Sequence, residues 1–141
     1  MIILDTNVVS ELMRPEAELK VRAWADGVRR AEQWITTVTA MELLEGALGL
    51  PAGRRRTHFV NGVEHLLRRS FASRILSFDL ASAEAAAALA VERARQGRRI
   101  EIRDTQIAGI AIAHNARLAT RNIRHFRDLP VEVIDPWTHK A

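Results

Sequence analysis

Short runs of apolar and β-branched residues recur along this chain, and helical patterns lie between one run and the next. The runs cover residues 2–4, 33–38, 74–78, 117–119 and 131–134, and they have the length and composition of buried strands. Repeated alternation of strands and helices favours a parallel sheet with helices on both faces. We therefore predict an α/β protein in which residues 2–4 form the central strand.

Besides a helix that starts at Thr6 and Asn7, the helical patterns predict five helices. Three of them cover residues 19–30, 41–48 and 58–71. The fourth follows Asp79, a residue type that caps helix N-termini, and stops at Gly97, a typical helix end. The fifth covers 104–116 and has Asp104 in its first turn. Residues 50–56 predict a turn between helices, so we expect one domain over residues 1–141.

The residue types that are missing exclude several kinds of site. The chain has no cysteine, which rules out disulfides, thiolate metal ligands and thiol catalysis. The apolar N-terminal stretch is interrupted at Asp5, and no run approaches the roughly 18 residues needed to cross a bilayer. We therefore expect a soluble, cytoplasmic protein without a membrane partner.

The cationic side chains are almost all arginine. Lys and Arg together number 21 against 17 Asp and Glu, a net charge of +4, and only Lys20 and Lys140 are lysine. The planar guanidinium matches the geometry of phosphates and carboxylates. This composition fits a polyanionic or acidic protein partner, and it fits a solvated arginine-rich surface equally well.

Acidic and amide side chains fall where the predicted strands end. Asp5 directly follows the first strand, Glu42 lies near the start of the helix after the second, and Asn122 follows the fourth. Asp104 opens the helix that precedes the fourth strand. Because open α/β sheets bind ligands at the carboxyl ends of their strands, we expect these four side chains along one edge.

Three carboxylates at one edge require compensation. At about 4 Å and an effective dielectric of about 20, each pair repels by roughly 4 kcal/mol. A shared proton or a divalent cation would offset this repulsion, and three carboxylates without cysteine favour Mg²⁺ or Mn²⁺ over Zn²⁺. Taken singly, Asp5 and Asp104 also fit helix capping and Glu42 fits a solvated acid.

Four motifs carry a family resemblance, and together they span nearly the whole chain. They are ILDTNVVSEL at 3–12, TAMELLEG at 39–46, IRDTQIAGIAIAHNARLATRNIRHF at 102–126 and IDPW at 134–137. With these motifs in this order, the sequence resembles the PIN-domain ribonucleases, and among them the VapC-type toxins of the FitB-like branch.

The resemblance implies a three-layer α/β/α PIN domain that hydrolyses RNA phosphodiester bonds with a divalent cation. It implies catalytic positions at Asp5, Glu42, Asp104 and Asn122, of which the three acids would hold Mg²⁺ or Mn²⁺. Thr6 and Thr120, which flank these positions, would support the site by hydrogen bonding.

The resemblance also implies partners. The toxins of this family are neutralised by an antitoxin, whose C-terminal segment lies across the site and often inserts a basic side chain among the acids. Such toxins usually form homodimers, and they reach operator DNA only through the antitoxin. The implied substrate is RNA.

Two positions depart from the family pattern. Asn122 stands where FitB-like members often have Asp, and His125 stands where a TRNxxDF pattern places an acid. Both changes remove negative charge, so we expect one bound cation rather than two. His125 could donate a proton to the leaving oxygen or contact a phosphate, but we expect a loop histidine with neither role.

Arginines near the predicted site form a candidate RNA-binding set: Arg98, Arg99, Arg103, Arg121 and Arg124. A second cluster, at 54–56 and 68–69, fits a solvated face or an antitoxin contact. Base-stacking aromatics are scarce, and we expect Trp137 to be a packing residue.

Two other functions remain alternatives. Acyl-phosphate chemistry also uses an Asp at a strand end, but it requires a second nearby acid and a late lysine. Here Thr6 and Asn7 follow Asp5, and Lys140 lies beyond the last predicted strand. The stronger alternative is a PIN-like module that binds RNA or protein and is catalytically impaired by Asn122.

Overall fold

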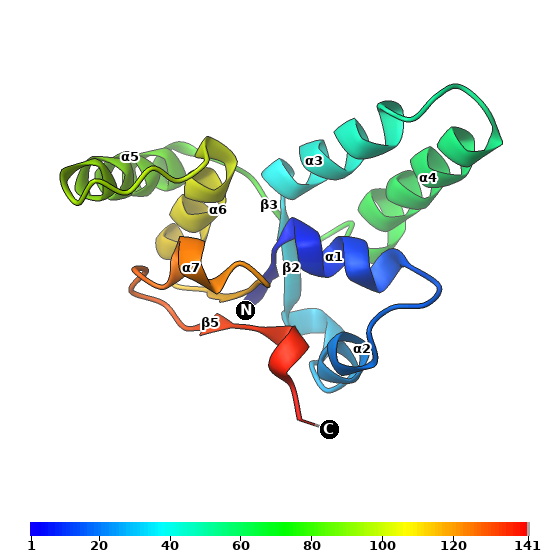
Figure 1. The fold of residues 1–141 in the computed structure, drawn as a ribbon, viewed down its shortest axis with the longest axis horizontal. Helices are drawn as coiled ribbons and strands as arrows, with labels where there is room; N and C mark the ends of the chain where they lie inside the picture. Colours follow the sequence, from blue (N-terminus) through cyan, green and yellow to red (C-terminus); the bar gives the residue numbers. More distant parts are fainter. Residues whose placement is uncertain (141) are drawn as a thin grey trace.

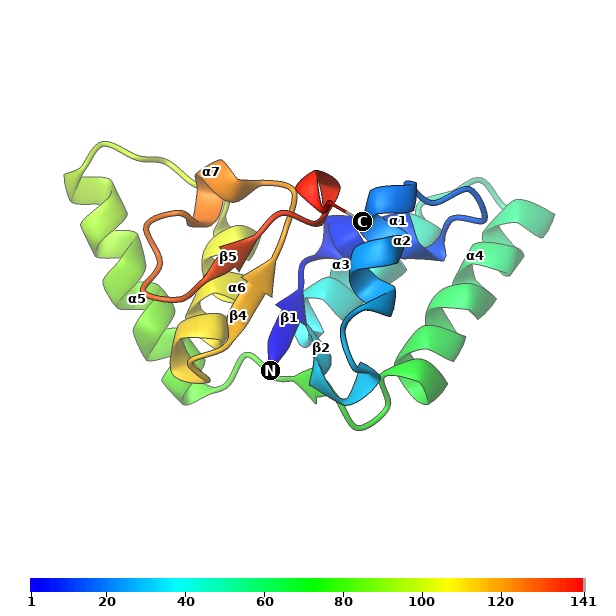
Figure 2. The same cartoon turned by 90° about the horizontal axis from the view of Figure 1, so that it is seen from below.

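Five parallel strands form one sheet in the order β3-β2-β1-β4-β5, so the strand at residues 2–4 is central, as predicted. The computed structural model describes residues 1–140. The strands are β1 (Ile2–Leu4), β2 (Gln33–Thr36), β3 (Ile75–Leu76), β4 (Arg117–Ala119) and β5 (Val133–Ile134). Figure 2 shows them between α5 and α4, which lie at opposite ends of the molecule.

Helices connect the strands and cover both faces of the sheet, which confirms the three-layer α/β/α class (Figure 1). They are α1 (Thr6–Met13), α2 (Leu19–Asp26), α3 (Thr37–Leu48), α4 (Arg54–His65), α5 (Leu80–Arg95), α6 (Ile102–Ala113) and α7 (Ile123–Phe126). A π-helical turn, Leu66–Ser70, continues α4, and short 3₁₀ turns lie at Arg30–Glu32 and Pro136–Thr138. None of the helices within residues 1–140 is long and apolar enough to cross a bilayer.

Alternating side chains of β1 serve two separate cores. Ile2 and Leu4 pack with residues of α1, α2, α3 and α4, whereas Ile3 packs with residues of α6 and α7. This is the period-two alternation of a strand between two helical layers. All three residues are at most 2% exposed, so β1 is buried on both faces.

Helix α6 packs unusually close to α5, and this fixes the position of its N-terminal turn. A Cβ atom added at Gly109 would lie 2.5 Å from the carbonyl oxygen of Ser82 and 2.7 Å from the Cβ of Ala86. Only glycine permits this approach. The contact holds the helix that carries Asp104 against the Ala-rich helix α5, whose predicted N-cap at Asp79 is confirmed.

Several predicted boundaries were wrong, and local capping explains them. Strand β2 ends at Thr36 because its hydroxyl accepts the Thr39 N–H at 3.1 Å and starts α3. Helix α2 ends at Asp26, before Gly27, and not at residue 30. Helix α4 begins after Gly53, whose φ of 151° suits glycine, and not at residue 58. The four-residue helix α7 was not predicted.

Candidate active site

Asp5 lies where β1 leaves the core, and it is only 3% exposed. One carboxylate oxygen accepts the Thr6 N–H at 2.8 Å, and the other accepts the Thr120 hydroxyl at 2.7 Å. Burial raises the pKa of Asp5 from its usual 3.8 to about 6, although these hydrogen bonds act to lower it. The charges of Asp104 and Glu42 add to the rise in pKa.

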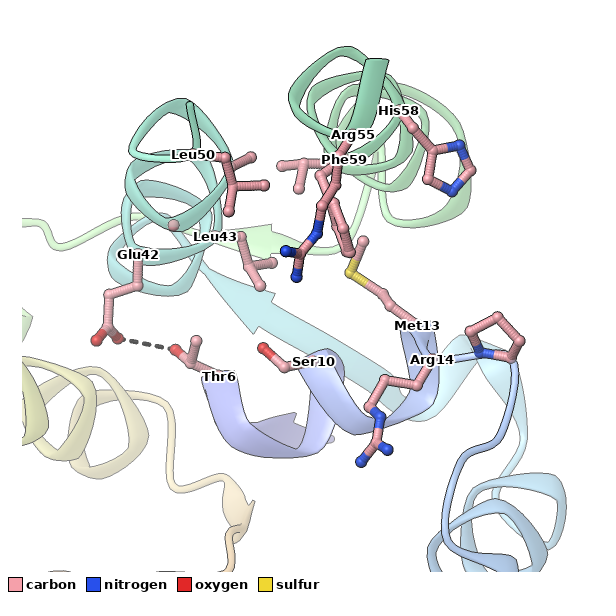
Figure 3. A pocket seen from close by; sticks show the side chains of 14 residues that line it. Thr6, Ser10, Met13, Arg14, Glu42, Leu43, Leu50, Arg55, His58 and Phe59 are labelled. Carbon is pink, nitrogen blue, oxygen red and sulfur yellow. Dashed lines mark hydrogen bonds between the residues drawn. The ribbon is translucent and has the colours of Figure 1, made fainter. Parts of the chain in front are cut away.

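Glu42 lies in the second turn of α3 and is held by α1. Its carboxylate accepts the Thr6 hydroxyl at 2.8 Å, the bond drawn in Figure 3. The Thr6 hydroxyl is also 2.9 Å from the hydroxyl of Thr39. Burial raises the pKa of Glu42, the charge of Asp104 adds to the rise, and the guanidinium of Arg103 opposes it. Thr6 therefore joins the Asp5 and Glu42 corners of the site.

Asp104 is the third residue of α6, and its carboxylate meets a histidine. The Nδ1 atom of His125 lies 2.6 Å from Asp104 Oδ2. His125 therefore lies in a helix and contacts a site residue instead of standing in a loop, and whether it donates a proton or contacts phosphate stays a prediction. The unpredicted helix α7 turns the histidine toward α6, where its ring contacts one of the three carboxylates.

The three acids do not form the tight cluster assumed in the repulsion estimate. Within residues 1–140, no three His, Asp or Glu side chains are grouped closely enough to hold a metal ion. Each carboxylate is instead hydrogen-bonded to a protein group: Asp5 to Thr120, Glu42 to Thr6 and Asp104 to His125. The donors are nonetheless carboxylate oxygens, the ligands that a hard cation prefers.

Asn122 occupies the N-cap position of α7 rather than the centre of the acidic group. Its backbone N–H donates to Thr120 Oγ1 at 3.0 Å, and the same hydroxyl donates to Asp5. The residue also lines a separate depression among arginines. The structure thus connects Asn122 to Asp5 through Thr120, and within residues 1–140 the Asn122 side chain makes no hydrogen bond to an acid.

Asn7, which was not among the predicted site residues, joins three parts of the site. Its amide nitrogen lies 3.2 Å from Asp5 Oδ2 and 3.4 Å from Thr120 Oγ1, and its amide oxygen accepts the Arg121 N–H at 3.2 Å. The DTN motif contains the residue and was the available signal. Asn7 ties the end of β1 to the segment that follows β4.

Sequence analysis also missed Arg93, a cation that is only 2% exposed. Its guanidinium makes two bonds to Asp128, at 2.9 and 3.0 Å, and donates to Thr105 Oγ1 at 3.1 Å. It also donates to the backbone carbonyl of His125. Arg93 therefore links α5 to α6 and α7, beside the Asp104 and His125 pair, and its bonds lower the pKa of Asp128.

A cavity of about 480 Å³ opens on the α3 side of the acids. It lies between α1, α3 and α4, and Figure 3 shows Leu43, Leu50, Met13 and Phe59 lining it. Thr6 and Glu42 form its border with the acidic group. We call this space the apolar cavity; the arginines at its rim are Arg14 and Arg55.

Comparison with known proteins identifies the family. The chain matches the PIN domain family over residues 2–132, and it belongs to that family. The resemblance inferred from the four motifs is therefore confirmed.

Individual proteins and structures similar to this chain give a more specific comparison within the family. The chain is 37% identical to the VapC ribonuclease Y4jK of Sinorhizobium fredii, covering 97% of this chain and 98% of that protein. It is 34% identical to toxin FitB of Neisseria gonorrhoeae, covering 97% and 99%. A solved structure of FitAB bound to an IR36 DNA fragment superposes with a TM-score of 0.91 at 32% identity, covering 100% and 99%.

Proposed function

We propose that this chain is a metal-dependent ribonuclease that hydrolyses RNA phosphodiester bonds and serves as the toxin of a type II toxin–antitoxin system. The observation that carries the proposal is the buried Asp5 carboxylate at the carboxyl end of the central strand, which Thr6 links to Glu42 by donating its N–H to Asp5 and its hydroxyl to Glu42. Relatives that cover 97% of the chain are a VapC ribonuclease and a FitB toxin, which supports the same function.

Asp5, Glu42 and Asp104 are the residues that would hold the cation, Mg²⁺ or Mn²⁺, and because they are not grouped closely enough in this structure, their carboxylates would draw together on binding it. The raised pKa values of Asp5 and Glu42 support this assignment, because a nearby positive charge would offset both burial and repulsion. When bound, such a cation activates water and neutralises charge that develops on the phosphate. With Asn122 at the fourth position, we infer a single cation.

The remaining contacts assign roles to the chain's own residues. Thr6 and Thr120 orient Glu42 and Asp5 through their hydroxyl groups. His125 holds Asp104. Glu42 is half-buried and has a raised pKa, so it suits acceptance of a proton from the attacking water.

A nuclease assay tests this proposal against the alternative of a binding module. The purified chain, free of antitoxin, is incubated with structured RNA and Mg²⁺ or Mn²⁺, alongside Asp5→Asn. We expect cleavage by the parent and none by the variant. If neither protein cleaves, the ribonuclease proposal fails and the binding module is favoured.

We further propose a cognate antitoxin as partner, and the apolar cavity as the place where its segment docks. A cavity lined by Met13, Leu43, Leu50 and Phe59 suits apolar side chains, and its border with Glu42 admits a basic side chain toward the acids. Homodimer formation, contact with operator DNA through the antitoxin, and cytoplasmic action belong to the same proposal, and the FitAB complex with DNA supports the antitoxin and the DNA contact.

A further inference from the structure

A second depression, of about 580 Å³, lies on the α7 side of the acids. Two segments build most of it: the loop before α6 and the stretch from β4 through α7. We call it the arginine groove; its cationic members are Arg98, Arg99, Arg121, Arg124 and Arg127.

The positive charge of this groove is largely uncompensated. Its only acidic lining residue is Asp135, which accepts the Trp137 N–H at 2.9 Å. Arg98 pairs with Asp128 at 2.8 Å. Arg99, Arg124 and Arg127 are exposed, and none of the three forms an ion pair within residues 1–140. The groove therefore presents free guanidinium groups to solvent.

Arg103, also predicted to contact RNA, differs from these residues. Its guanidinium lies 2.9 Å from Glu45 and 3.9 Å from Glu42. It faces α3 and not α7, and its charge is balanced by these acids. We therefore exclude Arg103 from the groove and assign it to the support of Glu42.

The groove adjoins the acidic site through two shared residues. Asn122 lines the groove, and its N–H donates to Thr120 Oγ1, which in turn donates to Asp5. His125 also lines the groove and contacts Asp104. A polyanion with one phosphate at the acids would therefore have its neighbouring phosphates among the arginines.

We propose that the RNA backbone runs along the arginine groove, with Arg99, Arg124 and Arg127 contacting phosphates on one side of the cleaved bond. This inference rests on the proposed ribonuclease function. Planar guanidinium groups pair with phosphate oxygens in a bidentate geometry. An acidic protein segment would need apolar anchors, and the larger apolar surface lies in the apolar cavity instead.

Arg121 adds a contact of a different kind. Its guanidinium stacks over the Trp137 ring, 5.0 Å from the centroid. Trp137 therefore packs as predicted and also fixes the direction of Arg121 at the junction of groove and acids. This leaves Arg99 and Arg124 as the simplest pair to remove without disturbing a contact within the chain.

The test compares two double variants of equal charge in an Asp5→Asn background, which binds RNA without cutting it. Arg99→Gln with Arg124→Gln removes groove cations, and Arg54→Gln with Arg69→Gln removes exposed cations at the two ends of the α4 region. Binding of an unstructured single-stranded RNA is titrated across salt concentrations without divalent metal. We expect the groove variant to weaken binding roughly tenfold and to reduce the salt slope by about 1.4, since each phosphate contact contributes about 0.7.

Equal effects from the two variants would overturn the proposal. So would an acidic peptide, such as polyglutamate of matched charge, that binds the groove as tightly as RNA does. Cleavage kinetics of the native site separate this proposal from the proposed function. If the parent cleaves RNA and the groove variant has the same KM, the groove proposal alone is contradicted. If the parent does not cleave RNA but its RNA binding depends on the groove arginines, the ribonuclease proposal alone is contradicted.

Discussion

The apolar cavity and the arginine groove flank the same acidic residues but offer opposite chemistry. The cavity on the α3 side is lined by Leu43, Leu50 and Phe59, whereas the groove on the α7 side presents uncompensated arginines. One edge of the sheet therefore suits the proposed apolar antitoxin segment on one side and the proposed RNA on the other. The two proposed ligands would share only the acids and their immediate neighbours.

The two flanks also differ in how they are held together. Apolar packing among α1, α3 and α4 builds the cavity wall, and Phe59 remains 41% exposed there. The groove side depends on polar contacts, chiefly those of the buried Arg93 with Asp128, Thr105 and the His125 carbonyl. Substitutions on the two flanks should consequently have separable effects.

The largest effect is expected at the shared acids. Asp5→Asn should lower cleavage roughly 1,000-fold or more, because the substitution removes a charged ligand from the proposed cation. If Asp5→Asn lost activity on only one kind of RNA, the idea of one acidic centre common to both flanks would be contradicted. The measurement is kcat/KM at saturating Mg²⁺.

The same variant should be at least as stable as the parent, in a pH-dependent way. The raised pKa of Asp5 means that ionisation destabilises the folded state above about pH 6, by up to about 3 kcal/mol. The stability gained by Asp5→Asn should be present at pH 7.5 and should vanish as the pH falls below about 4. Below that pH the Asp5 carboxyl of the parent is protonated in both the folded and the unfolded state. Urea unfolding without metal measures this, and a large loss of stability would assign Asp5 chiefly to helix capping.

The next effect concerns the polar flank. Arg93→Met should lower the free energy of unfolding by roughly 3 kcal/mol, because it leaves the buried hydrogen-bond partners of the guanidinium unpaired. Arg95→Met, two residues further along α5, is the control. The Arg95 side chain is 74% exposed and 3.8 Å from Glu92, so the cost should stay below about 0.5 kcal/mol. Similar unfolding midpoints for both variants would show that Arg93 does not hold the groove side.

A smaller effect is expected at the apolar flank. Phe59→Glu should weaken antitoxin binding roughly 30-fold, the loss of about 2 kcal/mol at a buried anchor, while RNA cleavage by the free chain stays unchanged. Leu48→Glu is the matched control, since Leu48 is 51% exposed and lies outside the cavity. Titration calorimetry measures binding, and a loss of RNA cleavage in Phe59→Glu would break the separation of the flanks.

The smallest effect is expected where the two flanks meet. His125→Ala should weaken the apparent affinity for Mg²⁺ roughly tenfold, because Asp104 loses the group that orients it. His125→Asn retains an N–H near the position of Nδ1 and should recover much of that loss. Metal titrations of the cleavage rate distinguish the variants, and equal behaviour of the two would rule out orientation by this hydrogen bond.

The central parts of the fold followed from the sequence because they depend on local patterns. Apolar runs determined the strands, and the end of the first run placed Asp5 at the edge of the sheet. Arg93 escaped prediction because its burial depends on Asp128, 35 residues away, and in sequence it resembles any basic residue near a helix end. His125 escaped because α7 is only four residues long, too short for a periodic pattern. The metal-binding and catalytic roles of the acids stay predictions.

The shortness of β1 has a consequence for which changes this chain can tolerate. Three residues divide the two cores between them, with Ile3 facing one way and Ile2 and Leu4 the other. A one-residue insertion or deletion between Ile2 and Asp5 would exchange the two faces and move the carboxylate out of register with Thr120. Length variation should therefore be confined to segments such as the turn at Gly53, because the spacing from Ile2 to Asp5 sets folding and chemistry together.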